Sequence, residues 1–574
     1  MLNNNFLNKK NIIYSFILLS SLFVMFQSLF GICFADESFY IAEAQRLFQG
    51  QKLLIDDYNG AQFYTPILFP FFSVFFKITK TTDGILLAAR LVQTLITCIV
   101  GIYMFFSLKK IYTMLLAFSS FFIFIFYTKD AIRGLSYYAL AVDFYLLAVL
   151  FLYNSKNKSN SILYFCAGIF FGLSIICNPF ILLFYLVASF ILLCAFFATK
   201  KKFHFTSVIL VWCGTVLVGG IYVFYCFHFS DLPELISSVQ SIFNTVEGDG
   251  LFVKTAYFFI RIMRPFVLTG IIPLFTVVFQ LFFLLSKKEC INNRYKYTLF
   301  FLNFIVFLYS CFIRTNSPGF FCIPLFYFGI VCMFLQANDF SFFKSSVFLY
   351  FALPGIFLAI AFYYASNTGT NAATIGFLVT VPFSLYYIFL FVSNMMSHKV
   401  QLAVKAVVLL TAFTLSVYQK FFIIFSDDSV FELNTKITQG PWKGCYTSKT
   451  HKNIYDEILA DINYINETAS LEDSLFVAPM LSWGYIAFKG KINSPNLWEI
   501  YLDDQNLKRF FDTHDLPEYV YIVLSTEQER KYHRFRMSYN SESEINGWFY
   551  DDVLSRFYTE YRLKKGILFK IANK

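Results

Sequence analysis

The chain has 574 residues, of which 57% are hydrophobic, only 14% are charged and 79 are Phe. Because about a quarter of the residues of a soluble domain are charged, this composition excludes a soluble protein and indicates a polytopic α-helical membrane protein. The net charge of +10 does not indicate nucleic-acid binding. The basic residues lie in short loops between apolar runs, with no basic stripe interleaved with aromatic residues.

The first apolar run covers residues 12–33 and follows Lys9 and Lys10. It resembles a secretory signal, but a run of about 20 apolar residues is too long for the apolar core of a signal peptide. No small-residue cleavage site follows it either. We therefore interpret it as a retained first span whose amino-terminal end is cytoplasmic.

Two adjacent carboxylates, Asp36 and Glu37, follow this span directly. The next residues have the spacing of an amphipathic surface helix, with Tyr40, Ala44 and Phe48 on one face. Carboxylates are costly to hold where a span leaves the bilayer, so such groups are commonly functional. The alternative is that Asp36 only caps the helix and that Glu37 is solvated at the positive end of the helix dipole.

Further apolar runs recur along the chain, and about thirteen in total are predicted to be spans. They lie near residues 12–33, 84–106, 111–127, 137–153, 161–177, 180–199, 206–228, 262–286, 298–313, 320–336, 347–364, 372–393 and 401–424. Basic residues recur in alternate loops, which places those loops in the cytoplasm. An odd number of spans then places both the acid pair and the carboxyl-terminal tail outside.

The composition becomes soluble near Asp427, so we expect a transmembrane domain at 1–425, with a first outer loop at 34–83, and an extracytoplasmic domain at 426–574. Helical and strand-like patterns alternate in the tail, which predicts a small α/β domain. The helical patterns cover 454–465, 497–511 and 551–562, and the strand-like patterns cover 474–478, 485–488, 519–524 and 566–571. The tail contains neither a GxGxxG nor a P-loop pattern, so no nucleotide site is expected.

These features, in this order, resemble the GT-C class of membrane glycosyltransferases, which includes the protein O-mannosyltransferases and the lipid A aminoarabinose transferase. The resemblance rests on the acid pair, the amphipathic loop helix, a return segment containing Pro66, and Arg90 inside the second span. Gly168 and Gly172, followed by Asn178 and a proline, are similar to the passage between the fifth and sixth spans of that class. The resemblance covers the topology and the amino-terminal third of the chain.

The resemblance implies an inverting transferase that moves a sugar from a polyprenyl-phosphate donor to a lipid, glycan or protein acceptor on the outer face. Asp36 would be the base that takes the acceptor proton, beside Glu37, and Asp143 matches the second acid of the family. Cations must face the leaving phosphate, and the best-placed ones are Arg90 and Arg133, with Arg261 and Arg264 next. Each arginine could instead extend to the headgroups, and Asp143 could instead pair with an arginine of a neighbouring span. Asp130 is the fallback for the second acid.

Thr65 stands where the family often carries a Lys before the return-loop proline, so no phosphate clamp is carried over from that position. No cofactor is certain, and a divalent metal held by Asp36 and Asp143 is left open. A transporter or flippase of lipid-linked glycans is the main alternative, although the hydropathy pattern lacks the internal repeat that transporters commonly show. A glycan polymerase or ligase, or a protein without catalysis, is also open. The Asn, Lys, Ile and Phe bias favours a bacterial plasma membrane.

Overall fold

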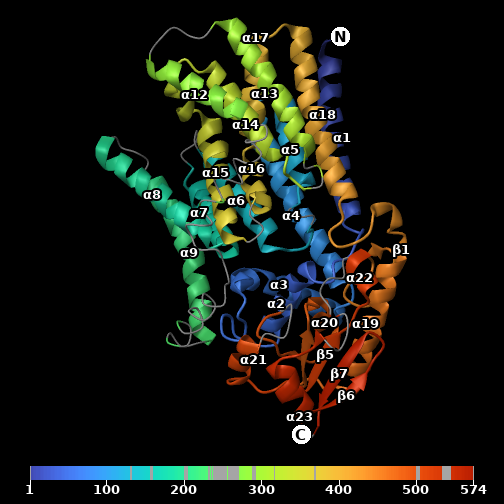
Figure 1. Ribbon diagram of the computed structural model, residues 1–574. Coiled ribbons are helices and arrows are strands. Elements are labelled where there is room, and N and C mark those ends of the chain that lie inside the picture. Colours follow the sequence, from blue (N-terminus) through green and yellow to red (C-terminus); the bar gives the residue numbers. More distant parts are fainter. Residues whose placement is uncertain are drawn as a thin grey trace.

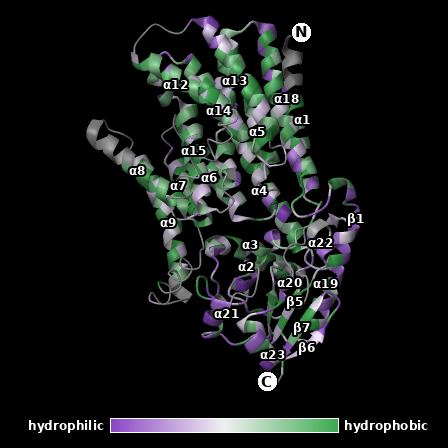
Figure 2. Cartoon of the chain, viewed as in Figure 1, coloured by the Kyte–Doolittle hydropathy of each residue, from purple (hydrophilic) through white to green (hydrophobic). Residues whose placement is uncertain are grey.

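Apolar helices form one end of the molecule, and the carboxyl-terminal α/β region covers the other (Figure 1). The computed structural model describes residues 2–128, 132–155, 160–199, 205–229, 271–286, 292–313, 315, 317–366, 370–498, 504–532, 539 and 544–572, together with 233, 236, 255 and 257. Hydrophobic residues dominate the helical end, and hydrophilic residues gather on the carboxyl-terminal region (Figure 2). This division supports the predicted change of composition near Asp427.

Each predicted span contains part of an apolar helix. These helices are α1 (Leu2–Gln27), α4 (Ile85–Leu108), α5 (Met114–Phe126), α6 (Tyr137–Ser155), α7 (Ser161–Cys177), α8 (Phe180–Thr199), α9 (Phe205–Phe229), α12 (Ile271–Ser286), α13 (Asn293–Ile313), α14 (Cys322–Gln336), α15 (Leu353–Ala365), α16 (Thr370–Val379), α17 (Val381–Met395) and α18 (His398–Phe422). Among the described residues, 8 helices are long and apolar enough to cross a membrane, or up to 9 if α16 and α17, bent by 59°, count as one span. Five other apolar helices are shorter. The chain is therefore a polytopic helical membrane protein.

One of these eight helices was not predicted. It covers Gly60–Thr79, within the expected first outer loop, and comprises the 3-10 helix η1 (Gly60–Tyr64) and α3 (Thr65–Thr79). Asn59 caps η1 by accepting from the Ala61 N–H at 2.8 Å, and a proline stands in the first turn of α3. Proline fits there because the first N–H groups of a helix have no partner within it.

Helix α2 (Asp36–Phe48) begins at the residue where the sequence predicts it. Its polar face is not solvated, because Glu37, Glu43 and Arg46 are all buried. A solvated polar side does not match this burial, and the expectation of a helix at the membrane surface stays a prediction. The carboxyl-terminal region covers that side.

Polar side chains from α2 and the following turn hold the carboxyl-terminal region in place. They donate hydrogen bonds to main-chain carbonyl oxygens: Gln45 Nε2 to Tyr485 at 3.1 Å, Gln49 Nε2 to Gly490 at 2.8 Å and Arg46 Nη2 to Ser494 at 2.6 Å. Gln51 donates to the Ile492 carbonyl in the same way. Helix α2 and the turn after it thus form one contact surface with residues 485–494 of the carboxyl-terminal region.

A five-stranded mixed sheet forms the centre of this region, in the order β4-β3-β5-β7-β6. The strands are β3 (Ser474–Ala478), β4 (Lys491–Ile492), β5 (Tyr519–Val523), β6 (Tyr558–Arg562) and β7 (Gly566–Ile571). β3 pairs in parallel with β4 and β5, whereas β7 pairs antiparallel with β5 and β6. The predicted α/β character and the strands at 474–478, 519–524 and 566–571 are confirmed.

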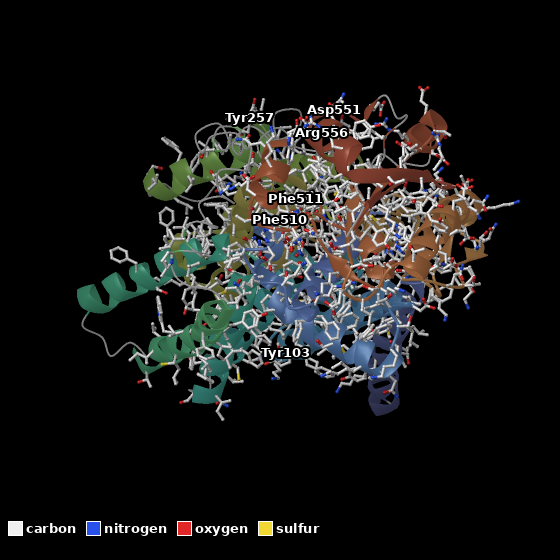
Figure 3. All side chains as sticks on the ribbon, turned by 90° about the horizontal axis from the view of Figure 1, so that it is seen from below. Tyr103, Tyr257, Phe510, Phe511, Asp551 and Arg556 are labelled. Carbon is white, nitrogen blue, oxygen red and sulfur yellow. The ribbon has the colours of Figure 1, made fainter. Side chains whose placement is uncertain are left out.

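Two predictions for this region are wrong. Residues 485–488, expected to be a strand, belong largely to helix α20 (Ser482–Ala487), whereas 551–562, expected to be a helix, ends in strand β6. Helix α19 (Lys449–Thr468) contains the predicted helix at 454–465, and α21 (Asp504–Phe511) covers the end of 497–511. Seen from below in Figure 3, Phe510 and Phe511 lie toward the middle of the molecule, while Asp551 and Arg556 lie toward its edge.

Candidate functional site

Asp36 opens α2 and is half-buried. Burial, and then the nearby charge of Asp36, raise the pKa of Tyr40 well above its ordinary value. The same two causes, in the same order, raise the pKa of the Cys33 thiol. Asp36 therefore lies among groups that stay neutral at physiological pH, beside the end of the first span.

Glu37 forms a buried ion pair with Arg90. Arg90 Nε lies 2.6 Å from Glu37 Oε2, and each side chain is 3% exposed. Glu37 Oε1 accepts a second hydrogen bond, at 2.7 Å, from the main-chain N–H of Arg133. Arg90 also donates to the Gly31 carbonyl at 2.7 Å, and its guanidinium lies 4.7 Å from the centre of the Trp442 ring. The pair thus joins the end of α1, α2, α4 and the carboxyl-terminal region, and the alternative of a solvated Glu37 is wrong.

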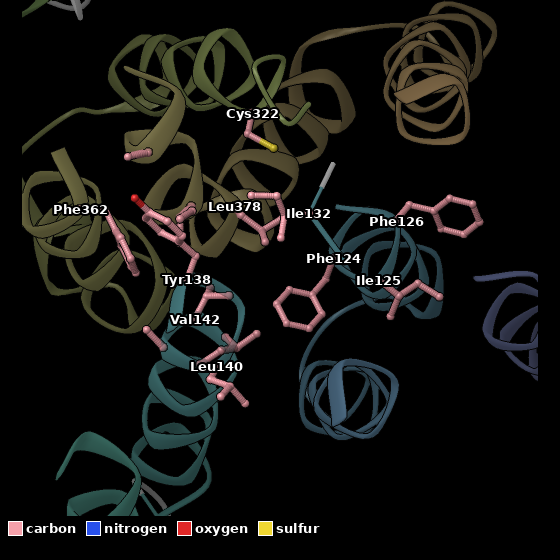
Figure 4. Packing of buried hydrophobic residues seen from close by; sticks show 14 of the residues in the cluster. Phe124, Ile125, Phe126, Ile132, Tyr138, Leu140, Val142, Cys322, Phe362 and Leu378 are labelled. Atoms are coloured by element: carbon pink, nitrogen blue, oxygen red, sulfur yellow. The ribbon is translucent and has the colours of Figure 1, made fainter. Parts of the chain in front are cut away.

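A cavity lies beside this ion pair, between α4, α5, α6, α16 and α18. Its polar lining includes Gln93, Thr97, Arg133, Asp143 and Lys420. The apolar part of its wall includes Phe124, Ile132, Tyr138, Val142 and Leu378, whose side chains are seen together in Figure 4. The cavity therefore offers one acid and two cations next to an apolar surface.

Asp143 is 1% exposed and lies in the second turn of α6. Its Oδ2 accepts hydrogen bonds from Gln93 Nε2 at 2.7 Å and from Thr97 Oγ1 at 2.9 Å, both on α4. Its Oδ1 is buried and has no hydrogen-bond partner in the described part of the chain. The alternative of an arginine partner does not match these contacts. Because a buried carboxylate oxygen is costly to leave unsatisfied, Oδ1 is suited to accept from a ligand in the cavity.

Arg133 precedes α6, and its Nη1 donates to the Phe30 carbonyl at 2.6 Å. Its Nε and Nη2 are buried without a hydrogen-bond partner among the residues that the structure describes. Burial, and then repulsion by Arg90, lower the pKa of Arg133 to about 9. Arg133 therefore lines the cavity with two N–H-bearing atoms that a ligand can use.

Lys420 was missed by the sequence reasoning. It is 5% exposed, near the end of α18, and lines the same cavity. A lysine inside the last apolar run was the available signal, since a buried ionisable residue of a span is a functional candidate by default.

The structure brings together some of the predicted site residues and separates others. Arg133 and Asp143 share the cavity, and Glu37 and Arg90 form the adjacent ion pair. Asp36 is not among the cavity-lining residues. The predicted positions Arg264, Arg261 and Asp130 lie outside the described residues. The roles given to all of these residues stay predictions.

A separate group of three side chains could bind a metal. The ligand atoms of Asp427, Asp428 and His451 all lie within 4.8 Å of one another, which makes them the one such group of three found among the described residues. Neither Asp36 nor Asp143 belongs to this group, and the metal site suggested for those two residues stays a prediction.

No protein-family model matches the chain, and no curated protein matches it in sequence. Across nearly its full length, the chain is similar in structure to enzymes of the GT-C class. One is the archaeal oligosaccharyltransferase AglB from Archaeoglobus fulgidus in complex with an inhibitory peptide and a dolichol-phosphate, at a TM-score of 0.48 and 12% identity, covering 98% of this chain and 75% of that chain. Another is ArnT from Cupriavidus metallidurans in the apo state, at a TM-score of 0.43 and 12% identity, covering 97% of each chain. The same ArnT bound to undecaprenyl phosphate matches at a TM-score of 0.40 and 10% identity, again over 97% of each chain. These scores and identities are too low to indicate a shared chemistry.

Proposed function

We propose that the chain is an inverting glycosyltransferase that moves a sugar from a polyprenyl-phosphate donor to a lipid, glycan or protein acceptor outside the cytoplasm. The observation that carries the proposal is the cavity that Arg133 and Lys420 share with Asp143. Two buried cations suit a phosphate group, and the adjacent apolar wall suits a prenyl chain. The unpartnered Oδ1 of Asp143 suits a sugar hydroxyl.

The phosphate of the donor would lie against Arg133. A guanidinium presents its N–H groups as a planar fork that matches phosphate oxygens, and Nε and Nη2 of Arg133 form one edge of that fork. Lys420, on α18, would add a compact positive charge. Both charges act in a buried site, where they stabilise the charge that develops on the leaving phosphate more strongly than they would in water.

The acceptor would attack the anomeric carbon on the side opposite the phosphate, which inverts that carbon. The acceptor oxygen or nitrogen forms a new bond to carbon as the bond from carbon to the phosphate oxygen breaks. The acceptor proton passes to a carboxylate, and the electron pair of the broken bond stays on the phosphate. Asp36 is the proposed base because it is half-buried and so is reachable from outside, whereas Asp143 would hold the sugar.

Glu37 and Arg90 would position these groups rather than react. Glu37 fixes the main chain at Arg133, so the phosphate-binding fork depends on the ion pair behind it. Under this proposal the phosphate contacts predicted for Arg90 are replaced by contacts from Arg133 and Lys420.

The test uses full-length protein purified in detergent, with its bound lipids identified by mass spectrometry and transfer measured with a lipid extract as donor. Asp36→Asn should lower transfer by about 10²–10⁴-fold while the lipid phosphate stays bound. Arg133→Gln with Lys420→Gln should instead lose the lipid phosphate. Asp512→Asn, an exposed carboxylate of the carboxyl-terminal region, is the matched control and should behave as the wild type.

Near-normal transfer by Asp36→Asn would remove Asp36 from the mechanism. If wild-type protein moves a lipid-linked glycan across the membrane of a vesicle and transfers no sugar, the flippase interpretation would replace the enzyme interpretation.

A further inference from the structure

Asp427, Asp428 and His451 meet at the boundary between the membrane helices and the carboxyl-terminal region. The two aspartates lie in the linker just after α18, and His451 lies in the first turn of α19. The backbone that leads into α2 touches the same group, because Ile32 N–H donates to Asp427 Oδ2 at 2.7 Å. The backbone before α2, the linker after α18 and the first turn of α19 therefore meet at these three side chains.

The nitrogen Nδ1 of His451 is surrounded by oxygen atoms. It lies 3.0 Å from Asp427 Oδ1, 3.2 Å from Asp428 Oδ2 and 2.9 Å from Ser448 Oγ. One ring N–H can point well at only one of these oxygens. Asp427 Oδ1 also accepts from the Asp428 N–H at 2.8 Å, but that bond does not bring the Asp428 carboxylate to the same nitrogen. A cation between the ligands explains the convergence, since ligands bound at about 2.0–2.2 Å from one metal lie about 3 Å or slightly more from each other.

The surroundings of these ligands also resemble those of a metal site. The side chains of His451 and Asp427 are 1% and 0% exposed. The second oxygen of Asp427 is held by the Ile32 N–H and, at 2.6 Å, by Thr447 Oγ1. The His451 ring stacks on Phe34 with ring centres 5.6 Å apart. Carboxylate and imidazole ligands of metals are typically oriented by such outer contacts.

We propose that Asp427, Asp428 and His451 bind a divalent transition-metal cation of the Zn²⁺ type, which ties the carboxyl-terminal region to the backbone that precedes α2. The imidazole nitrogen favours this class over Mg²⁺ or Ca²⁺, which prefer oxygen ligands alone. Ser448 Oγ or a solvent molecule completes the coordination. Neither Arg133 nor Asp143 belongs to the group, so the site does not depend on the proposed transfer reaction.

The experiment measures Zn²⁺ in full-length protein purified in detergent, after equilibration with Zn²⁺ and removal of free metal. Wild-type protein should retain about one Zn²⁺ per chain. Asp428→Asn and His451→Gln should each weaken binding at least about tenfold. His514→Gln is the matched control, because the His514 ring contacts a single carboxylate, with Nε2 3.1 Å from Asp56 Oδ1. This variant should bind as much Zn²⁺ as the wild type.

Thermal unfolding supplies a second measurement that does not depend on activity. A chelator should lower the unfolding temperature of the wild type and of His514→Gln but leave that of Asp428→Asn unchanged, and added Zn²⁺ should restore the wild type. The proposal is overturned if wild-type protein retains no Zn²⁺ or if Asp428→Asn and His451→Gln retain as much Zn²⁺ as the wild type. It is also overturned if the chelator changes the unfolding temperature of neither the wild type nor His514→Gln.

Discussion

The ion pair between Glu37 and Arg90 allows a sharp test of what Arg90 does. Both side chains are 3% exposed and 2.6 Å apart. Removing one partner of such a pair leaves the other charge buried and uncompensated, which costs about 3–5 kcal/mol. Arg90→Met also removes the 2.7 Å hydrogen bond from Arg90 Nη1 to the Gly31 carbonyl. The loss of this donor adds about 1–3 kcal/mol. We therefore expect Glu37→Gln and Arg90→Met each to reduce stability strongly, Arg90→Met more so.

The measurement is equilibrium unfolding in detergent micelles titrated with SDS. The loss of stability in the double variant Glu37→Gln/Arg90→Met should be about 1–3 kcal/mol smaller than the sum of the losses in the single variants, because the double variant leaves no uncompensated buried charge. Arg556→Met is the matched control, since Arg556 pairs with Asp552 at 2.7 Å but is 67% exposed. Its loss should stay below about 1 kcal/mol.

A different result would refute this reasoning. If Arg90→Met keeps the stability of the wild type within about 0.5 kcal/mol and instead loses the bound lipid phosphate, then Arg90 is a phosphate ligand, as the sequence predicts. The ion pair would then have no structural role of its own.

Two further predictions concern the same part of the molecule. Gly31 and Gly50 both have positive φ, +80 and +85, but a Cβ at Gly31 would lie 2.4 Å from Ile424 Cγ2, whereas a Cβ at Gly50 would meet open space. Gly31→Ala should therefore cost more stability than the roughly 1–2 kcal/mol expected for Gly50→Ala in the same unfolding titration. Equal losses of stability would contradict the clash at Gly31. In a Lys420→Met background, where Arg133 is the cavity's remaining cation, lipid phosphate should still be retained, because the guanidinium keeps its charge. Arg133→Gln in that background should release the lipid phosphate, and retention by the double variant would refute the role of Arg133.

Apolar run length located an apolar helix in each predicted span, because a span must satisfy its backbone internally. It did not give the number of spans, since about thirteen were predicted and 8, or up to 9, of the described helices are long and apolar enough to cross a membrane. The start of α2 at Asp36 also followed from local signals. Residues 485–488 show where this reasoning fails, since four apolar residues fit a strand and a buried helix equally well. Burial beneath the rest of the domain, which decides between them, is not a local property.

The candidate site was only partly predictable, because its partners are distant in the sequence. Asp143 was singled out as a buried acid, but nothing local shows that Gln93 and Thr97 would face it from α4. Lys420 carried a signal in its apolar surroundings. The pairing of Glu37 with Arg90, by contrast, requires knowledge of how the first two spans pack.

The hydrogen bonds from α2 to the carboxyl-terminal region also have a consequence for biosynthesis. Gln45 and its acceptor at Tyr485 are 440 residues apart. At roughly 5–20 residues per second, the ribosome needs roughly 20–90 s between the two. During that interval the polar side of α2 lacks these partners, so the loop that carries Asp36 cannot reach its final shape until the carboxyl-terminal region has been made. A premature stop before Tyr485 would therefore remove these partners and disturb the opposite end of the polypeptide, long after that end had been inserted.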